Sequence, residues 1–117
     1  MADKKQVKSL YESVESLIGP SAVFDGNIKT DKVVRIDGVV NGDIFAAGVI
    51  IGPDAQVKGN IKTSAIFVGG TVYGNIESSE SVEIMPKAKV VGDVKTNIFT
   101  IAEGAFFEGK SSMLGQQ

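Results

Sequence analysis

The segment IGPSAVFDGNIKT, residues 18–30, returns as IGPDAQVKGNIKT at residues 51–63, and nine of these thirteen positions are identical. A looser third copy, IMPKAKVVGDVKT, occupies residues 84–96. Each copy begins 33 residues after the one before it, and the chain's three prolines keep the same interval. Self-similarity at a short, fixed period is typical of a solenoid, in which each unit packs only on its neighbours.

A second, weaker copy lies inside each 33-residue unit. Its marker is a glycine that recurs at intervals of 15 to 18 residues, at Gly26, Gly42, Gly59, Gly74, Gly92 and Gly109. Two residues before each glycine stand Phe24, Val40, Val57, Val72, Val90 and Phe107, and two residues after stand Ile28, Ile44, Ile61, Ile76, Val94 and then Ser111. A further column contains Ile18, Ile36, Ile51, Val68, Ile84 and Ile101. Apolar residues spaced by two predict strands, whereas a helix would space them by three and four.

These columns predict an all-β, single-domain parallel β-helix. About six turns fit the chain, over residues 16–30, 34–46, 49–63, 66–78, 82–96 and 99–112. In the first, third and fifth turns the glycine follows the isoleucine column by eight positions, and in the second and fourth turns it follows by six. We therefore expect one corner of the coil to be longer on alternate turns. Lys62, Glu77 and Lys95 share one column and alternate in charge, which favours stacking.

The composition excludes several classes of function. The 117 residues suit one domain, and the net charge of −2 with a single arginine argues against a nucleic-acid-binding protein. The chain has neither Cys nor His, which removes the usual nucleophile–base pairs and zinc ligands. We predict no catalytic, cofactor-binding or metal-binding residues. No signal peptide or membrane-spanning segment is apparent, so the cytoplasm is the expected location.

The end of the predicted coil is rich in phenylalanine. The last turn holds Phe99, Phe106 and Phe107, half of the chain's six phenylalanines, and only MLGQQ (113–117) follows it. The column rule directs Phe99 and Phe107 inward and Phe106 outward. These rings could fill the core locally, or they could stack on the same end of another subunit, since a solenoid needs a cover at each end. Ile18 and Phe24 are the corresponding candidates in the first turn.

The N-terminal residues 1–15 are expected to form a separate tail. Val7, Leu10, Val14 and Leu17 are spaced by three and four, which indicates a short amphipathic helix. The segment could be a simple tail packed over the first turn, or it could bind a membrane surface or a partner protein. The apolar stripe has no Trp or Phe, so the membrane signal is weak.

These features together resemble the bactofilin family of bacterial cytoskeletal proteins. The resemblance rests on the IGPxAxxxGNI opening, the six-turn coil with Gly-Asn and Gly-Asp corners, the run VEIMPKAKVVGDVKT (82–96) and the Phe-containing last turn, and it covers residues 16–112. It implies a right-handed, three-faced β-helix that polymerises without nucleotide into non-polar filaments, joined head to head and tail to tail.

The resemblance also implies a cellular role. Such proteins act in cell shape or morphogenesis and recruit cell-wall-modifying enzymes, often at the inner face of the membrane. In the family an apolar residue of the last turn carries polymerisation, which here corresponds to Phe106 or Phe107.

Other solenoid functions fit the sequence less well. Left-handed β-helix acyltransferases depend on a catalytic His and keep a six-residue period, neither of which is present. A polysaccharide hydrolase needs paired acids in a groove, but Asp25, Asp31, Asp37 and Asp54 are scattered. A calcium-binding β-roll would need GGxGxD repeats, and an ice-binding solenoid would need a ladder of paired threonines. The main alternative is a β-helix adaptor or binding module that does not polymerise.

Overall fold

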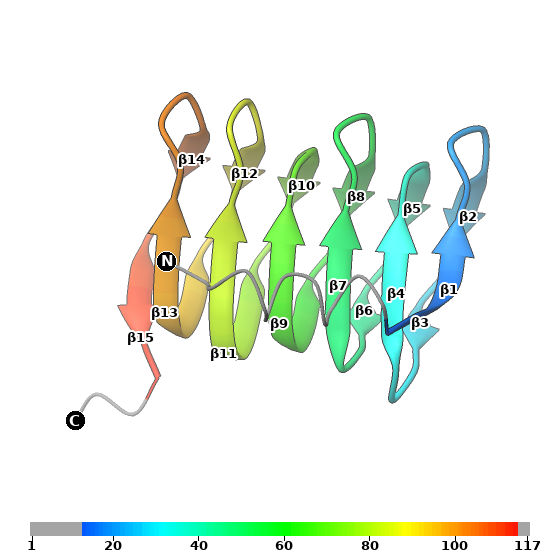
Figure 1. The fold of residues 1–117 in the computed structure, drawn as a ribbon, viewed down its shortest axis with the longest axis horizontal. Coiled ribbons are helices and arrows are strands. Elements are labelled where there is room, and N and C mark those ends of the chain that lie inside the picture. Colours follow the sequence, from blue (N-terminus) through cyan, green and yellow to red (C-terminus); the bar gives the residue numbers. More distant parts are fainter. Residues whose placement is uncertain (1–12, 115–117) are drawn as a thin grey trace.

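The computed structural model describes residues 13–114, which form one parallel β-solenoid without a helix (Figure 1). Its strands are β1 (Val14–Ile18), β2 (Val23–Asp25), β3 (Ile28–Lys29), β4 (Val33–Ile36), β5 (Val39–Asn41), β6 (Ile44–Phe45), β7 (Gly48–Ile51), β8 (Gln56–Lys58), β9 (Ile61–Val68), β10 (Thr71–Tyr73), β11 (Ile76–Ile84), β12 (Lys89–Val91), β13 (Val94–Ile101), β14 (Phe106–Glu108) and β15 (Ser111–Met113). We call each turn of the coil a rung. In Figure 1 the front strands rise, the chain crosses the upper corner to the strands behind, and successive rungs advance from blue to red. This is the sense of a right-handed coil, and it confirms the predicted β-helix of about six turns.

The coil has three faces. The first face contains β1, β4, β7 and the second halves of β9, β11 and β13. The second face contains β2, β5, β8, β10, β12 and β14, in that spatial order. The third face contains β3, β6, the first halves of β9, β11 and β13, and finally β15. Every pairing is parallel, and the register places each predicted column residue beside its equivalent on the next rung, as Val40 beside Val57 and Val72 beside Val90.

The core is a column of stacked aliphatic side chains that runs along the axis of the coil. The largest of its fully buried side chains belong to Ile36, Ile44, Ile51, Ile61, Ile66, Ile76, Ile84, Val34, Val40, Val49 and Val57. Because neighbouring residues of a strand point to opposite sides, only alternate positions enter this column. β-Branched residues suit it, since they pack closely on a pleated surface.

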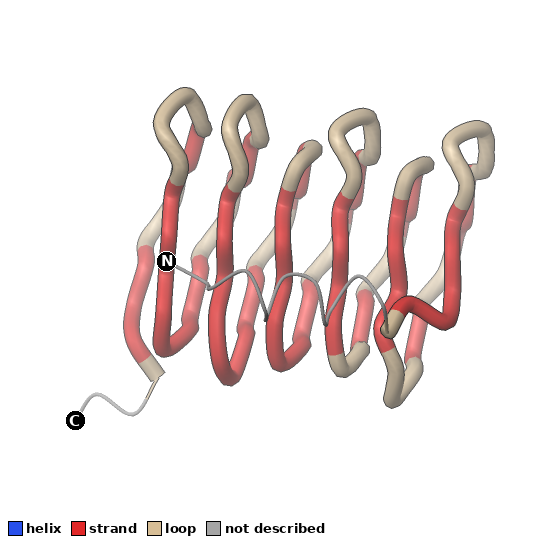
Figure 2. The backbone as a smooth tube through the Cα atoms, viewed as in Figure 1, coloured by secondary structure: helices blue, strands red, loops and turns tan. Residues whose placement is uncertain are grey.

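The corner between the first and second faces alternates in length over the first five rungs. The long corners are four residues and close with a β-turn hydrogen bond, for example from Ala55 N–H to the Gly52 carbonyl at 3.0 Å. The short corners are the pairs Asp37–Gly38 and Gly69–Gly70. Figure 2 shows the long corners as tall loops after β1, β7, β11 and β13, and the short corners as lower loops after β4 and β9. This confirms the alternation that the repeat spacing predicts for the first five rungs, and the sixth rung has a long corner like the fifth.

The corner between the second and third faces is held by a ladder of Asn and Asp side chains. The Oδ1 atom of each ladder residue accepts a hydrogen bond from the backbone N–H of the next rung's residue, as Asn60 does from Asn75 at 3.0 Å. The ladder positions are Asn27, Asp43, Asn60, Asn75, Asp93 and Lys110, and the last of these only donates its backbone N–H, to Asp93. A glycine precedes each ladder residue, and from the second rung onward a side chain there would collide with the rung before it. At Gly74 (φ 151°) a Cβ atom would lie 1.9 Å from the Gly59 carbonyl oxygen.

The prediction of a helix in the N-terminal segment is wrong for Val14 and the residues that follow it. Val14 and Leu17 lie in strand β1, where Leu17 pairs with Arg35 of β4. A free strand edge at the start of the coil offers these residues backbone hydrogen bonds, and that pairing outweighs a short periodic pattern. Val7 and Leu10 lie outside the described residues.

Candidate polymerisation interface at the terminal rungs

The core is open where the coil ends. Seven apolar residues pack against the core cluster while remaining only partly buried, and all of them except Ala46 lie in the first or the last rung: Ile18, Phe24, Ile28, Phe99, Ala105 and Phe107. The equivalent positions of the inner rungs are fully buried. The difference arises because a terminal rung has a neighbour on one side only.

Two of the C-terminal phenylalanines point into the coil, as the column rule predicts. The rings of Phe99 and Phe107 meet edge to face, with centroids 5.3 Å apart and an interplanar angle of 80°. This is a favourable geometry for an aromatic pair. Together the two rings form the last layer of the core, with one side packed on the rung below and the other uncovered by any strand among residues 13–114.

Phe106 lies on the outer side of the second face and is 48% exposed, so its predicted outward direction is also confirmed. Its ring lies beside Lys89 of the preceding rung, with the ammonium nitrogen 5.7 Å from the ring centroid. The same ammonium group is 5.5 Å from the Tyr73 ring. Phe106 is therefore a rim residue of the C-terminal end, partly held by a cation–π contact.

Both ends also carry strand edges without a partner. Among the described strands, β14, β15 and the Ile98–Ile101 half of β13 pair on one side only, and so do β1, β2 and β3 at the other end. An unpaired parallel edge presents a row of backbone donors and acceptors to a further strand. Each end thus combines exposed apolar side chains with free backbone hydrogen-bonding groups.

The N-terminal end differs in chemistry from the C-terminal end. Ile18 and Phe24, both predicted, line the opening with Ile28, and Leu17 and Val23 are exposed at its rim. Among residues 13–114, Phe24 is the one aromatic residue at this opening. That these side chains, or those of Phe99, Phe106 and Phe107, contact another subunit remains a prediction.

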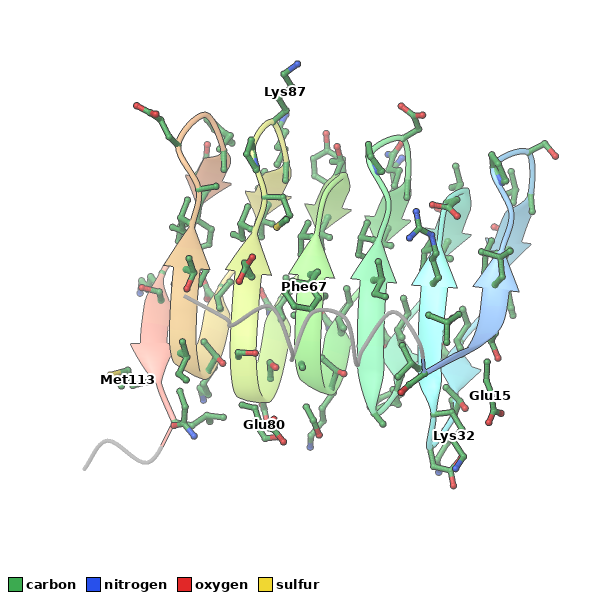
Figure 3. All side chains as sticks on the ribbon, viewed as in Figure 1. Glu15, Lys32, Phe67, Glu80, Lys87 and Met113 are labelled. Atoms are coloured by element: carbon green, nitrogen blue, oxygen red, sulfur yellow. The ribbon has the colours of Figure 1, made fainter. Side chains whose placement is uncertain are left out.

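Sequence reasoning omitted three further apolar residues of the C-terminal end, of which Ile98 in β13 is 54% exposed. Ile101 and Met113 are both exposed there, and Met113 is labelled near the end of the coil in Figure 3. Ile101 belongs to the isoleucine column, so the repeat alignment could have indicated it. Met113 occupies the column of Thr96, where nothing in the repeat pattern predicts an apolar residue.

A model of the bactofilins, described as polymer-forming cytoskeletal proteins, matches residues 16–112. The chain belongs to the bactofilin family. The matched range is the same as that of the predicted β-helix, and the family is a structural, cytoskeletal one.

Two solved bactofilin structures have the same fold. One is the bactofilin of Thermus thermophilus in double helical filaments, with 25% identity, a TM-score of 0.80, and coverage of 85% of this chain and 99% of that one. The other is the cytoskeletal bactofilin BacA determined by solid-state NMR, with 28% identity, a TM-score of 0.76, and coverage of 86% and 98%. No curated protein sequence matches this bactofilin. Within residues 13–114, no helix is long and apolar enough to cross a lipid bilayer.

Proposed function

We propose that this bactofilin assembles without nucleotide into non-polar filaments, by stacking the terminal rungs of one subunit on those of the next. The observation that carries the proposal is the partly buried core at both ends of the coil, at Ile18, Phe24, Phe99 and Phe107. The filament acts in the cytoplasm, peripherally at the inner face of the membrane, as a scaffold for cell shape and for cell-wall-modifying enzymes.

The free energy available at such a contact is sufficient. Fully burying one large apolar side chain contributes roughly 1.5–3 kcal/mol, and each C-terminal end offers several such side chains. Association costs about 4–15 kcal/mol in lost freedom of motion, and each contact buries one end of both subunits, so the apolar side chains of two ends act together to offset this cost. Pairing of the free strand edges adds backbone hydrogen bonds to the apolar contact.

The Asn and Asp ladder favours a non-polar arrangement. If subunits were stacked head to tail, the backbone N–H of Asn27 would need an acceptor from the ladder residue of the preceding subunit. That residue is Lys110, whose side chain only donates hydrogen bonds. A head-to-head and tail-to-tail arrangement does not require this missing bond.

Nucleotide independence is supported by the corners of the coil. A phosphate-binding loop presents several backbone N–H groups to an anion, usually at the start of a helix. The Gly69–Gly70 pair instead forms a short corner whose N–H of Gly69 donates to the Ile51 carbonyl at 2.7 Å. Its glycines are explained by crowding, because a Cβ atom at Gly70 would lie 2.4 Å from the Gly52 carbonyl oxygen.

Electron microscopy of the purified protein in the absence of ATP and GTP tests the proposal. We expect filaments at micromolar concentration, with no change on adding nucleotide. A field of dispersed monomers would favour the alternative function, a β-helix adaptor that binds partners without polymerising. Filaments that appear only with nucleotide would contradict the proposed mechanism.

A further inference from the structure

An apolar patch lies on the outer side of the first face. Val33 of β4, Ile50 of β7 and Phe67 of β9 form it, and none of them belongs to the core cluster. The register pairs Ile50 with Phe67, while their strand neighbours Val49 and Ile66 enter the core. Because strand residues alternate in direction, the patch must point away from the axis. Figure 3 shows Phe67 on the front of the first face, near the middle of the coil.

The patch is buried although it faces outward. Ile50 is 1% exposed and Phe67 is 5% exposed. Large apolar side chains in outward positions of the other two faces are far more accessible: Phe45 on the third face is 43% exposed and Tyr73 on the second is 37% exposed. All four have neighbours on both adjacent rungs. Stacking of rungs therefore leaves an outward side chain open to water, and the patch requires an additional cover.

The chain that precedes Ser13 is the nearest available cover. Strand β1, which begins at Val14, is the edge strand of the sheet that carries the patch. Rungs are spaced by about 4.8 Å, so β9 lies about 14 Å from β1. Residues 1–12 span about 18 Å as a helix and about 40 Å when extended. They can reach the whole patch in either conformation.

We propose that residues 1–12 of this chain dock on the outer side of the first face, across β4, β7 and β9, with Val7 and Leu10 packed on Ile50 and Phe67. The segment has the composition that this surface needs, since its apolar residues are few and are flanked by Lys4, Lys5 and Lys8, which keep its other side polar. Docking hides an apolar surface that would otherwise lie along the side of the coil. In the docked state Val7 and Leu10 are buried against the coil, so they are not available to bind a membrane or a partner protein.

Tryptophan fluorescence in the full chain tests this proposal, because the protein contains no Trp. In a Phe67→Trp variant we expect the indole to be protected from acrylamide quenching. Adding Val7→Asp and Leu10→Asp should raise the quenching to the level measured for Tyr73→Trp. The matched control is Tyr73→Trp itself, whose quenching should not respond to the two tail substitutions, because that position lies on the second face.

Two outcomes would overturn the proposal. Protection at position 67 that survives both tail substitutions would mean that the tail is not the cover. Protection that disappears on dilution would indicate a second copy of the chain on this face.

Because Trp is larger than Phe and could displace the segment by itself, a second measurement leaves the patch unchanged. A benzophenone attached to Ser9→Cys, in a chain that otherwise has no Cys, should cross-link to peptides that carry Ile50 or Phe67. In a mixture of isotope-labelled and unlabelled protein, the cross-linked pairs should come from one chain. Cross-links to another face, or pairs of mixed isotopic composition, would contradict docking within the chain.

Discussion

The edge of one ring in the Phe99–Phe107 pair points at the face of the other, with 5.3 Å between centroids, across the inside of the last rung. In every inner rung the corresponding pair is aliphatic, as Val82 and Val90 are in the rung before. The aromatic pair therefore marks the one layer of the core that has no further rung above it among residues 13–114. The repeat pattern of the sequence thus places the aromatic pair at the end of the coil through which we propose that subunits assemble.

Phe107→Arg should disrupt filaments while the coil remains folded. A guanidinium group at the centre of the C-terminal opening would have to lose its hydration on stacking, which costs several kcal/mol when no partner charge is present. We expect monomers or short oligomers in sedimentation and an unchanged β-type circular dichroism spectrum. Phe45→Arg, at an outward position of an inner rung, is the matched control and should sediment like the wild type. Filaments formed by Phe107→Arg and by Phe106→Arg alike would show that the C-terminal end is not a contact.

Gly74→Ala should destabilise the coil more than Gly26→Ala. Both glycines have positive φ angles, 151° and 136°, so either substitution strains the backbone by about 1–3 kcal/mol. Of these two positions, only at Gly74 does the new Cβ atom also meet a carbonyl oxygen, because Gly26 lies in the first rung, before which no strand of residues 13–114 is stacked. Chemical denaturation gives the free energy of unfolding of each variant. The loss in Gly26→Ala reports the backbone strain, and the additional loss in Gly74→Ala reports the collision. Equal losses would show that neighbouring rungs move apart easily.

Lys87→Gly should increase the free energy of unfolding by up to about 1 kcal/mol. A left-handed conformation costs a non-glycine residue roughly 1–2 kcal/mol, and the substitution removes this cost. Part of the gain is cancelled because glycine loses more backbone entropy on folding than lysine does. Lys87 has φ 70° in the long corner of the fifth rung, and Gly104 has φ 89° in the sixth. Gly104→Lys is therefore the reciprocal variant, and it should destabilise by a similar amount. Thermal melts of both variants check the pair; a lower melting temperature for Lys87→Gly would be inconsistent with the strain.

Thr96→Val should be neutral or slightly stabilising. The Oγ1 atom of Thr96 is buried without a hydrogen-bond partner among residues 13–114, and removing such a group recovers about 1–3 kcal/mol of desolvation cost at most. Ser78, in the same column, donates to the Ser81 carbonyl at 2.7 Å and lies 2.9 Å from the Ser64 carbonyl. Ser78→Ala should therefore lose about 1–2 kcal/mol. Denaturant midpoints would contradict this interpretation if Thr96→Val proved the more damaging change.

The repeated part of the fold was predictable because stacking imposes the same requirement on every rung. Val40, Val57 and Val72 share a column since each must fit the side chains before and after it. The alternating corner length was readable from the spacing between Ile51 and Gly59 and its shorter equivalents. The directions of the last-rung phenylalanines followed from the same alternation.

Features that break the repeat were not predictable from it. Val14 and Leu17 have helical spacing, but they pair with β4, because an exposed strand edge is a tertiary feature that a local pattern does not contain. Ile50 and Phe67 occupy outward positions, which the column rule assigns to solvent, and yet they are buried. The positive φ of Lys87 also has no signal in its residue type, since this conformation is usual for Gly and Asn.

The most direct test of end-to-end stacking is the axial repeat of the filament, measured by cryo-electron microscopy. Six rungs at about 4.8 Å predict one subunit for every 29 Å or so along the axis, and a non-polar filament should repeat after two subunits, at about 58 Å. The 4.8 Å rung spacing should continue without interruption from one subunit to the next. Filaments in which coils lie side by side, or in which the subunit spacing does not correspond to six rungs, would contradict assembly through the terminal rungs.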